Sequence, residues 1–527
     1  MFRPIAFFAA ALVAAHSLAL GDEAKSSRQV LGKVSFKTSC SKAVQPKFNR
    51  AVALLHSFWY TEAEEAFNQI AAEEPSCSIA YWGVAAILMN NPIAGQGALP
   101  SGAEQAQAAL DKAGANPPKT QRERDYIEAV SAYYKDFAQR SERERQVARA
   151  GAYEKLAAKY PEDDEAQIFY AVYLAATQTL TDKTYAATLK AAGILEQQFK
   201  KHPQHPGVAH YMIHSYDYPP IAQKGLSAAR SYAKIAPDAP HALHMPSHIF
   251  TRVGAWQESA QTNARSATAA RKGKESDESW HATDYMVYAY LQMARDRQAK
   301  ETWVEAQKDM NSRRFAGPYA MAAIPARLAI ERGDWKSAAS LEPRTTKFPF
   351  VDAMTHFARA LGAARNGNPD AAEKELPAIQ KLHAQLVEGK NAYWATEVEV
   401  SGLAALGWTR LAQGKSDEAL ERMRQAADME DKNDKHIVTP GRILPARELL
   451  GDMLLEMKRP ADALKEYETS QLREPNRFRG LYGAARAAEQ AGDAAKAKRY
   501  YAQLLKVAGK GDPRPELAAA RKYAAMK

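Results

Sequence analysis

Two short stretches decide the fold, HPGVAHYMIH at residues 205–214 and PHALHMPSHIF at residues 240–250. Each contains the pattern Pro-x-x-x-His-x-x-x-His, formed by Pro206, His210 and His214 in the first stretch and by Pro240, His244 and His248 in the second. Every member of the second copy follows its counterpart by 34 residues, a period typical of repeated helix pairs. Because residues i and i+4 share one face of a helix, the pattern predicts four imidazoles on two neighbouring helices, all facing the same way.

The same region holds eight of the 13 histidines of the chain, between His202 and His281. Neutral imidazole is the commonest transition-metal ligand, and helix axes about 8–10 Å apart leave a gap that facing imidazoles can bridge. Asp284 lies one turn after His281, on the same face, where a carboxylate could bind metal or hold an imidazole. The sequence therefore predicts a Zn or Cu site with the ligands His210, His214, His244, His248, His281 and Asp284.

Two considerations leave other interpretations of this histidine cluster open. Buried histidines also cap helices and bond backbone carbonyls, so a polar groove without metal is the alternative. Pro246 lies between His244 and His248. If a helix begins at Pro246, His244 falls in the preceding turn, whereas a helix that continues through Pro246 is kinked there.

The rest of the chain is also predicted to be helical, because helix formers dominate and Pro and Gly occur mainly at regular breaks. Ala463 and Tyr467 recur 34 residues later as Ala497 and Tyr501. About 500 residues exceed a single core, which favours a quasi-linear array of repeats. We therefore predict an all-α, right-handed α-solenoid in two parts, residues 44–340 and 351–510, with a hinge at 341–350, a flexible segment at 22–43, a polar loop inserted at 429–442 and a tail at 511–527.

The first 21 residues predict a signal peptide, with Arg3 at its start, an apolar run at 5–15 and small residues at 19–21. The apolar run is too short to span a membrane. We expect a periplasmic or secreted protein that is not embedded in the membrane. Cys40 and Cys77 are the only cysteines, and in an oxidising compartment such a pair predicts one disulfide, with two separate buried thiols as the alternative.

The net charge of +10 does not by itself indicate a nucleic-acid ligand. Lys and Arg are spread along the chain and interleaved with Glu and Asp, which is typical of a solvated helical surface. A nucleic-acid-binding protein is expected to show a clustered basic face and a recognisable module. We therefore expect no nucleic-acid partner.

Four motifs are more specific than a generic helical repeat: HPGxxHYxIH at 205–214, HAxHMPSHIF at 241–250, HAxDY at 281–285 and PNRF at 475–478. With these motifs the chain resembles a secreted bacterial family of tetratricopeptide-repeat (TPR) proteins, over nearly its whole length after the leader. The resemblance implies a helical-repeat fold and export. It implies no activity, so no catalytic residue is carried over.

Two functions are consistent with these observations. The first is an exported repeat protein that binds a protein or peptide partner in a concave groove and carries a histidine-rich transition-metal site. The alternative is a metal-dependent periplasmic enzyme, of unknown reaction, that uses the same cluster. An open ligand position together with an acid/base group would favour the enzyme, and a closed set of four ligands would favour a structural metal.

Overall fold

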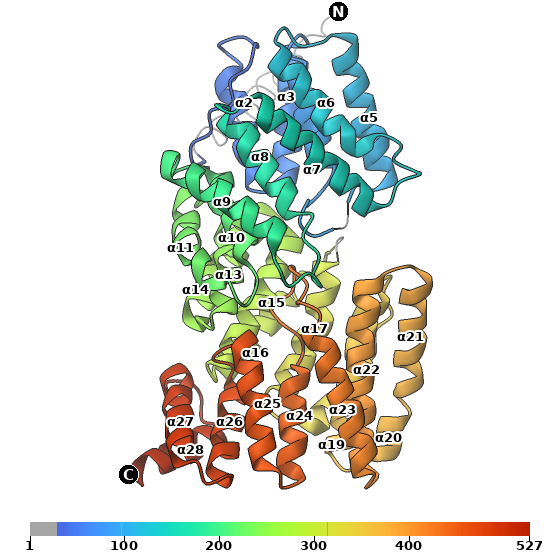
Figure 1. The fold of residues 1–527 in the computed structure, drawn as a ribbon, viewed down its shortest axis with the longest axis vertical. Helices are drawn as coiled ribbons and strands as arrows, with labels where there is room; N and C mark the ends of the chain where they lie inside the picture. The colour runs from blue at the N-terminus through green and yellow to red at the C-terminus, as the bar shows by residue number, and fades with distance from the viewer. Residues whose placement is uncertain (1–28, 96, 313–314, 527) are drawn as a thin grey trace, which may run out of the picture.

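The computed structural model describes residues 29–95, 97–312 and 315–526, and in these ranges all regular structure is helical, with no β-strand (Figure 1). Successive helices pack against one another along the chain, from one end of the long axis to the other. The predicted all-α solenoid is confirmed. The predicted signal peptide, residues 1–21, lies outside the described residues. Among the described helices, none is both long and apolar enough to cross a membrane.

The N-terminal repeats lie at the upper end of the view in Figure 1, and the central repeats follow below them and reach the level of the C-terminal repeats. The N-terminal helices are α2 (Gln45–His56), α3 (Tyr60–Glu73), α4 (Ile79–Leu88), α5 (Pro100–Ala115), α6 (Gln121–Tyr134), α7 (Glu142–Lys159), α8 (Asp164–Ala175) and α9 (Ala186–Lys201). The central helices are α10 (Pro206–Tyr216), the 3-10 helix η1 (Ala222–Gly225), α11 (Leu226–Ile235), α12 (Pro240–His244), α13 (Pro246–Arg252), α14 (Trp256–Gly273), α15 (Ser276–Gln292), α16 (Asp296–Ala306), α17 (Ala316–Ile330) and α18 (Trp335–Ala339).

The C-terminal repeats lie at the other end of the long axis (Figure 1). Their helices are α19 (Pro349–Arg365), α20 (Pro369–Glu373), α21 (Leu376–Glu388), α22 (Ala392–Ala412), α23 (Ser416–Asp431), α24 (Ala446–Glu456), α25 (Pro460–Arg473), α26 (Phe478–Gln490), α27 (Ala494–Ala508) and α28 (Pro515–Ala525). Many of these helices begin with a proline, whose missing N–H is not needed in a first turn. The segment predicted as a tail, residues 511–527, includes one of these helices, α28, and its Leu517 is fully buried.

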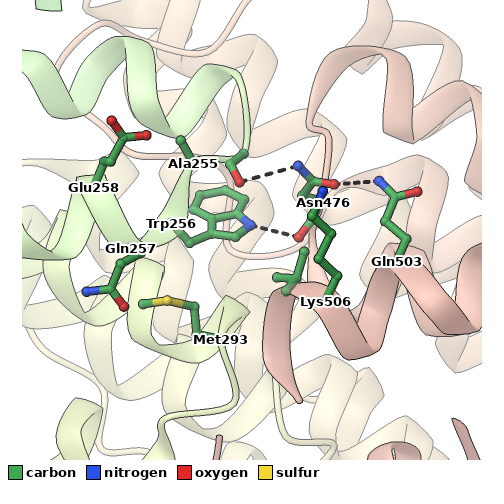
Figure 2. A pocket seen from close by; sticks show the side chains of 10 residues that line it. Ala255, Trp256, Gln257, Glu258, Met293, Asn476, Gln503 and Lys506 are labelled. Atoms are coloured by element: carbon green, nitrogen blue, oxygen red, sulfur yellow. Dashed lines mark hydrogen bonds between the residues drawn. The ribbon is translucent and has the colours of Figure 1, made fainter. Parts of the chain in front are cut away.

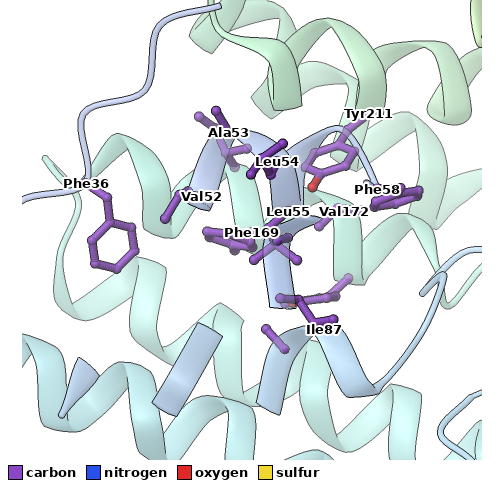
Figure 3. Packing of buried hydrophobic residues seen from close by; sticks show 14 of the residues in the cluster. Phe36, Val52, Ala53, Leu54, Leu55, Phe58, Ile87, Phe169, Val172 and Tyr211 are labelled. Carbon is purple, nitrogen blue, oxygen red and sulfur yellow. The ribbon is translucent and has the colours of Figure 1, made fainter. Parts of the chain in front are cut away.

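Aromatic and branched side chains fill the N-terminal core, which Figure 3 shows in part. Phe36 is fully buried there, with its ring centroid 5.1 Å from that of Trp82 and 4.9 Å from that of Tyr126. The flexible segment predicted at 22–43 is therefore corrected for residues 29–43: Val30 and Lys33 bond Asp238 and Gln204 beside the central helices, and Phe36 packs on the first repeats. Cys40 and Cys77 form a disulfide beside this core, with Cα atoms 5.0 Å apart.

The apolar core does not divide at the predicted hinge. Helices α17, α18 and α19 pack together across residues 340–348. The boundary between the two largest clusters of buried apolar side chains lies further upstream in the sequence. One cluster ends at Phe250 and the other begins at Ala294. Two smaller clusters, around Trp256 and Trp280, fill the space between them.

The polar insertion between α23 and α24 is buried against the central repeats. We call residues 432–445 the insertion segment. Asp434 N–H donates to the Leu180 carbonyl (3.1 Å), and the Tyr285 hydroxyl donates to the Thr439 carbonyl (2.9 Å). The insertion segment therefore occupies the face of α15 that carries Tyr285.

His436 on the insertion segment makes stability depend on pH. It stacks on Trp394, and burial, with Lys435 adding to the effect, lowers the pKa of His436 to about 3. The His436 side chain is protonated near pH 6.5 in the unfolded chain but only near pH 3 in the folded chain. Acidification between these values should therefore cost up to about 1.4 kcal/mol of folding stability per pH unit.

We expect His436→Phe, which keeps an aromatic ring against Trp394, to reduce this slope. The measurement is the free energy of unfolding by denaturant at several pH values between 4 and 7. Equal slopes for the wild-type and variant proteins would show that His436 is not the group responsible.

A buried arginine connects the last repeats to the central repeats. Arg477 precedes α26 and is fully buried. It donates to Glu331 Oε1 (2.6 Å), to Glu448 Oε1 (2.8 Å) and to the Tyr288 hydroxyl. The contact therefore joins four elements, because Tyr288 belongs to α15, Glu331 caps α17 and Glu448 lies in the first turn of α24.

A surface pocket of about 410 Å³ lies beside this contact (Figure 2). Trp256 and Met293 line one side, and Asn476, Gln503 and Lys506 line the other. The Trp256 indole N–H donates to the Asn476 carbonyl (2.7 Å), and Gln503 Nε2 donates to Asn476 Oδ1 (2.5 Å). The Trp256 bond strengthens the contact between the central and C-terminal repeats, and the Gln503 bond holds Asn476 in place from within the C-terminal repeats.

Candidate metal centre

The first histidine motif brings α10 very close to α2. The side chain of His205 caps α10, and Pro206 occupies its first turn. Gly207 follows, where a Cβ would lie only 2.5 Å from His56 Nδ1. This close approach allows His210 Nδ1 to donate to the His56 carbonyl oxygen at 2.6 Å. His205, Pro206 and Gly207 therefore each help to place His210.

Pro246 interrupts the second motif without turning its histidines apart. Helix α12 ends at His244 and α13 begins at Pro246, but Met245 between them keeps helical angles, φ −50° and ψ −37°. The chain therefore continues along one helical path although Pro246 cannot donate a backbone hydrogen bond. His244 and His248 still share a face, and their Nε2 atoms lie 3.0 Å apart.

Six histidines gather in two groups of three. Group A comprises His210, His214 and His241, and group B comprises His244, His248 and His281. Within each group, one nitrogen of each ring lies within 4.8 Å of the others. The two motifs therefore converge as their 34-residue spacing predicts.

Group A contains one hydrogen-bonded pair of rings and two nitrogen atoms without a partner in the part of the chain that the structure describes. His214 Nε2 is 3.1 Å from His210 Nε2. His241 Nε2 and His214 Nδ1 are buried without a hydrogen-bond partner among the described residues. His241 is the most exposed of the three rings, with 13% of its side chain accessible.

Four of the six rings are oriented by an acceptor on their outer nitrogen. Nδ1 of His210 bonds the His56 carbonyl (2.6 Å), Nδ1 of His241 bonds the Glu278 carboxylate (3.2 Å), Nδ1 of His244 bonds Asn263 Oδ1 (2.7 Å) and Nδ1 of His248 bonds Asp217 Oδ2 (2.9 Å). These oxygens accept, so each of the four Nδ1 atoms carries the proton and each Nε2 of the neutral ring keeps a lone pair. Metal-binding histidines are held in the same way.

Group B shows the consequence most clearly. Because Asn263 and Asp217 hold both protons on Nδ1, the Nε2 atoms of His244 and His248 face each other at 3.0 Å with two lone pairs and no proton. Two lone pairs in contact repel, and a cation between them would turn this repulsion into two bonds. The third ring, His281, lies with its centroid 4.1 Å from that of His244.

Burial keeps the rings in the form that binds metal. Burial, with His248 adding to the effect, lowers the pKa of His244 to about 3. Burial and the neighbouring histidines also hold the pKa values of His210, His214 and His281 well below the usual range. These side chains are therefore neutral at physiological pH, as ligation requires.

A third cluster, His56, Glu165 and His205, lies nearby but is already satisfied. His56 bonds the Tyr211 hydroxyl and Glu165, each at 2.9 Å. His205 bonds Glu165 through Nε2 and accepts a backbone N–H at Nδ1. Every ring nitrogen has a partner, so no lone pair is left for an ion, and we interpret this cluster as a hydrogen-bonded network that positions the His56 carbonyl.

Asp284 does not belong to either group, which corrects the predicted ligand set. Its carboxylate is buried and pairs with Arg327 from α17. Sequence reasoning also left His241 out of the site, although its position three residues before His244 is a helical same-face spacing. The oxygens that hold the rings, on Asp217, Asn263 and Glu278, have no fixed spacing from their partners and gave no signal.

Asn263 offers a test of this orientation by outer partners. We expect Asn263→Ala to weaken metal binding about 10–100-fold, because His244 loses the acceptor that fixes its tautomer. Asn263→Asp keeps an acceptor and should retain most of the affinity. Thr268→Ala, on the exposed side of the same helix and bonded only to the Ala264 carbonyl, is the matched control. Isothermal titration with Zn gives the affinities, and equal values for Asn263→Ala and Thr268→Ala would contradict the expected role.

Comparison with known proteins gave structural neighbours only. No family model matches the chain, and no curated protein matches it. Among solved structures, human IFIT1 dimers with PPP-AAAA and with m7Gppp-AAAA are 14% and 15% identical, both at TM-score 0.37, and cover 87% and 90% of this chain and 89% and 91% of their own. The APC/C hetero-tetramer Cut9-Hcn1 is 11% identical at TM-score 0.29, over 92% of this chain and 97% of the other.

Scores this low carry no conclusion about function. Two of the matched chains are complexes with PPP-AAAA and m7Gppp-AAAA, so they lend no support to the expectation that this chain lacks a nucleic-acid partner. Any proposed function therefore rests on the geometry of this chain.

Proposed function

We propose that this protein binds transition-metal ions, Cu or Zn, at groups A and B. The observation that carries the proposal is the pair of facing Nε2 atoms of His244 and His248, whose outer nitrogens are held by Asn263 and Asp217. A polar groove without metal would place a proton between two such nitrogens. All-imidazole ligand sets suit Cu and Zn.

The number of ligands favours a reactive site over a structural one. Each group offers three ring nitrogens, whereas a structural zinc site is closed by four protein ligands. An ion in either group would keep an open position for water or a small ligand. This feature supports the metal-dependent enzyme as the second candidate function, with no reaction assigned.

In this proposal the protein is periplasmic or secreted. The predicted leader supports export, and the disulfide between Cys40 and Cys77 fits an oxidising compartment. A protein or peptide partner would have to bind away from Tyr285 on α15, because the insertion segment already contacts that face.

The test is metal uptake by a double variant. We expect wild-type protein equilibrated with Zn or Cu to retain metal after gel filtration and the variant His210→Ala with His244→Ala to retain essentially none. One ligand is lost from each group, and the remaining two imidazoles hold an ion far more weakly. Elemental analysis gives the metal content, and far-UV circular dichroism should show unchanged helix content.

A matched control uses two histidines outside the groups. His202 pairs with Asp164, and His383 lies near Glu399, both with partly exposed side chains. Replacing these two by alanine should leave metal uptake at the wild-type level. Equal uptake by both double variants would contradict the assignment to groups A and B.

A further inference from the structure

Groups A and B are in direct contact with each other. The ring centroids of His214 and His248 are 5.8 Å apart, and those of His241 and His244 are 5.9 Å apart. Two rings of one group therefore oppose two rings of the other, and two ions held at the groups would be neighbours. Two-metal sites with a shared ligand have their ions about 3.5–4 Å apart.

The ligands bring no negative charge to this buried region. All six are imidazoles, and the nearest carboxylates bond their outer nitrogens. Asp217, behind His248, is already paired with Arg252 (2.7 Å) and lies 3.9 Å from Lys435 Nζ. Glu278, on His241 Nδ1, is another partly buried carboxylate beside the rings, and it could offset only part of the charge of two divalent ions. The remaining charge is costly away from water unless an anion joins the ions.

Aromatic side chains limit the size of that anion. The ring of Phe58 lies 4.4 Å from that of His210 and 5.7 Å from that of His241, and Tyr285 lies 4.8 Å from His244 and 5.1 Å from His248. Both aromatic residues are buried. A bulky substrate would have to displace these walls, so we expect the anion to consist of one or a few atoms.

We infer that groups A and B form one dinuclear metal site, filled by copper or zinc, in which two ions share a bridging anion the size of hydroxide. The inference rests on the proposed metal binding and adds the pairing of the ions and the class of ligand that joins them. In this site the open position of each ion, one per group, would face the other group. Hydroxide from water supplies the bridge, and azide is a chemical probe of the same size class and charge.

The test combines copper counting with electron paramagnetic resonance (EPR) of the full chain loaded with Cu(II). Two Cu(II) ions that share a single-atom bridge couple their spins and lose most of their signal. We expect two copper ions per chain and a spin count far below the copper content. Release in acid with oxygen excluded should then restore one spin per ion, which shows that the bound copper was Cu(II) and not Cu(I).

Other outcomes separate the inference from the proposed function. Two ions per chain with full spin, or one ion per chain, would overturn the dinuclear site and leave metal binding intact. No bound copper and no bound zinc would overturn the proposed function itself.

Two single variants sharpen the result. His281→Ala removes one ligand from group B, so we expect one copper per chain with its full signal. His202→Ala, outside both groups, should remain as silent as the wild type. Azide should change the visible absorption of the wild-type two-copper form at one azide per pair of ions, and a requirement for two azides per pair would contradict a shared bridge.

Discussion

Replacement of Arg477 by methionine is expected to lower the free energy of unfolding by about 3–5 kcal/mol. The guanidinium is fully buried between Glu331 and Glu448. Burial already raises the pKa of Glu448 to about 7, although Arg477 acts to lower it. Without the arginine, two buried carboxylates lose their cation and the C-terminal repeats lose their main polar contact with α15 and α17.

Denaturant unfolding followed by tryptophan fluorescence measures this effect, because Trp256 bonds Asn476 next to Arg477. Arg499→Met is the control, since Arg499 has 59% of its side chain exposed and pairs with Glu468 on the surface. Such a surface pair contributes about 0–1 kcal/mol. Equal destabilisation by the two variants would rule out the buried arginine as the main polar contact.

Loss of the disulfide is expected to have an effect of similar size. Replacing Cys40 and Cys77 by serine should cost about 4 kcal/mol in the chain-entropy model, because the bond closes a loop across a sequence separation of 37. The same bond ties the segment that carries Phe36 to the start of α4. We therefore expect the N-terminal repeats to loosen first in the variant.

The measurement is thermal unfolding of the wild-type and variant proteins by circular dichroism. Wild-type protein treated with a thiol reductant should shift in the same direction as the double serine variant, which controls for effects of the substitutions. Thiol titration of denatured, unreduced wild type should detect no free thiol. Detection of two thiols would show that the pair is not bonded in the isolated protein.

The sequence was sufficient to predict the fold and the convergence of the two motifs, for one physical reason. Stacked helix pairs bring residues one repeat apart side by side, so the 34-residue step from His210 to His244 and from His214 to His248 is itself a statement about distance. The spacing of four within each motif then fixes the shared face. Pro246 did not disturb this geometry because Met245 keeps helical angles.

Contacts without periodicity could not be predicted in the same way. Asp284 has the spacing of a ligand, yet Arg327, 43 residues away, takes its carboxylate. Asn263 and Asp217 bond the rings from a second helix and from a helix end, and no rule of spacing identifies them. The insertion segment has the composition of a solvated loop, and its burial depends on pairing with residues such as Leu180 and Tyr285, far away in the chain.

Because the insertion segment contacts residues far away in the sequence, it is expected to dock late in folding. Its contact with Tyr185 spans 249 residues, whereas the bonds that orient the histidines span at most 154 residues, between His210 and His56, and all of them lie before the later repeats. Local pairs form first, and contacts of high sequence separation form late. The histidine groups can therefore assemble while the later repeats are still unfolded. Lys435 and Thr439 cover the neighbourhood of group B only afterwards, which leaves an interval in which ions can enter before the chain closes over them.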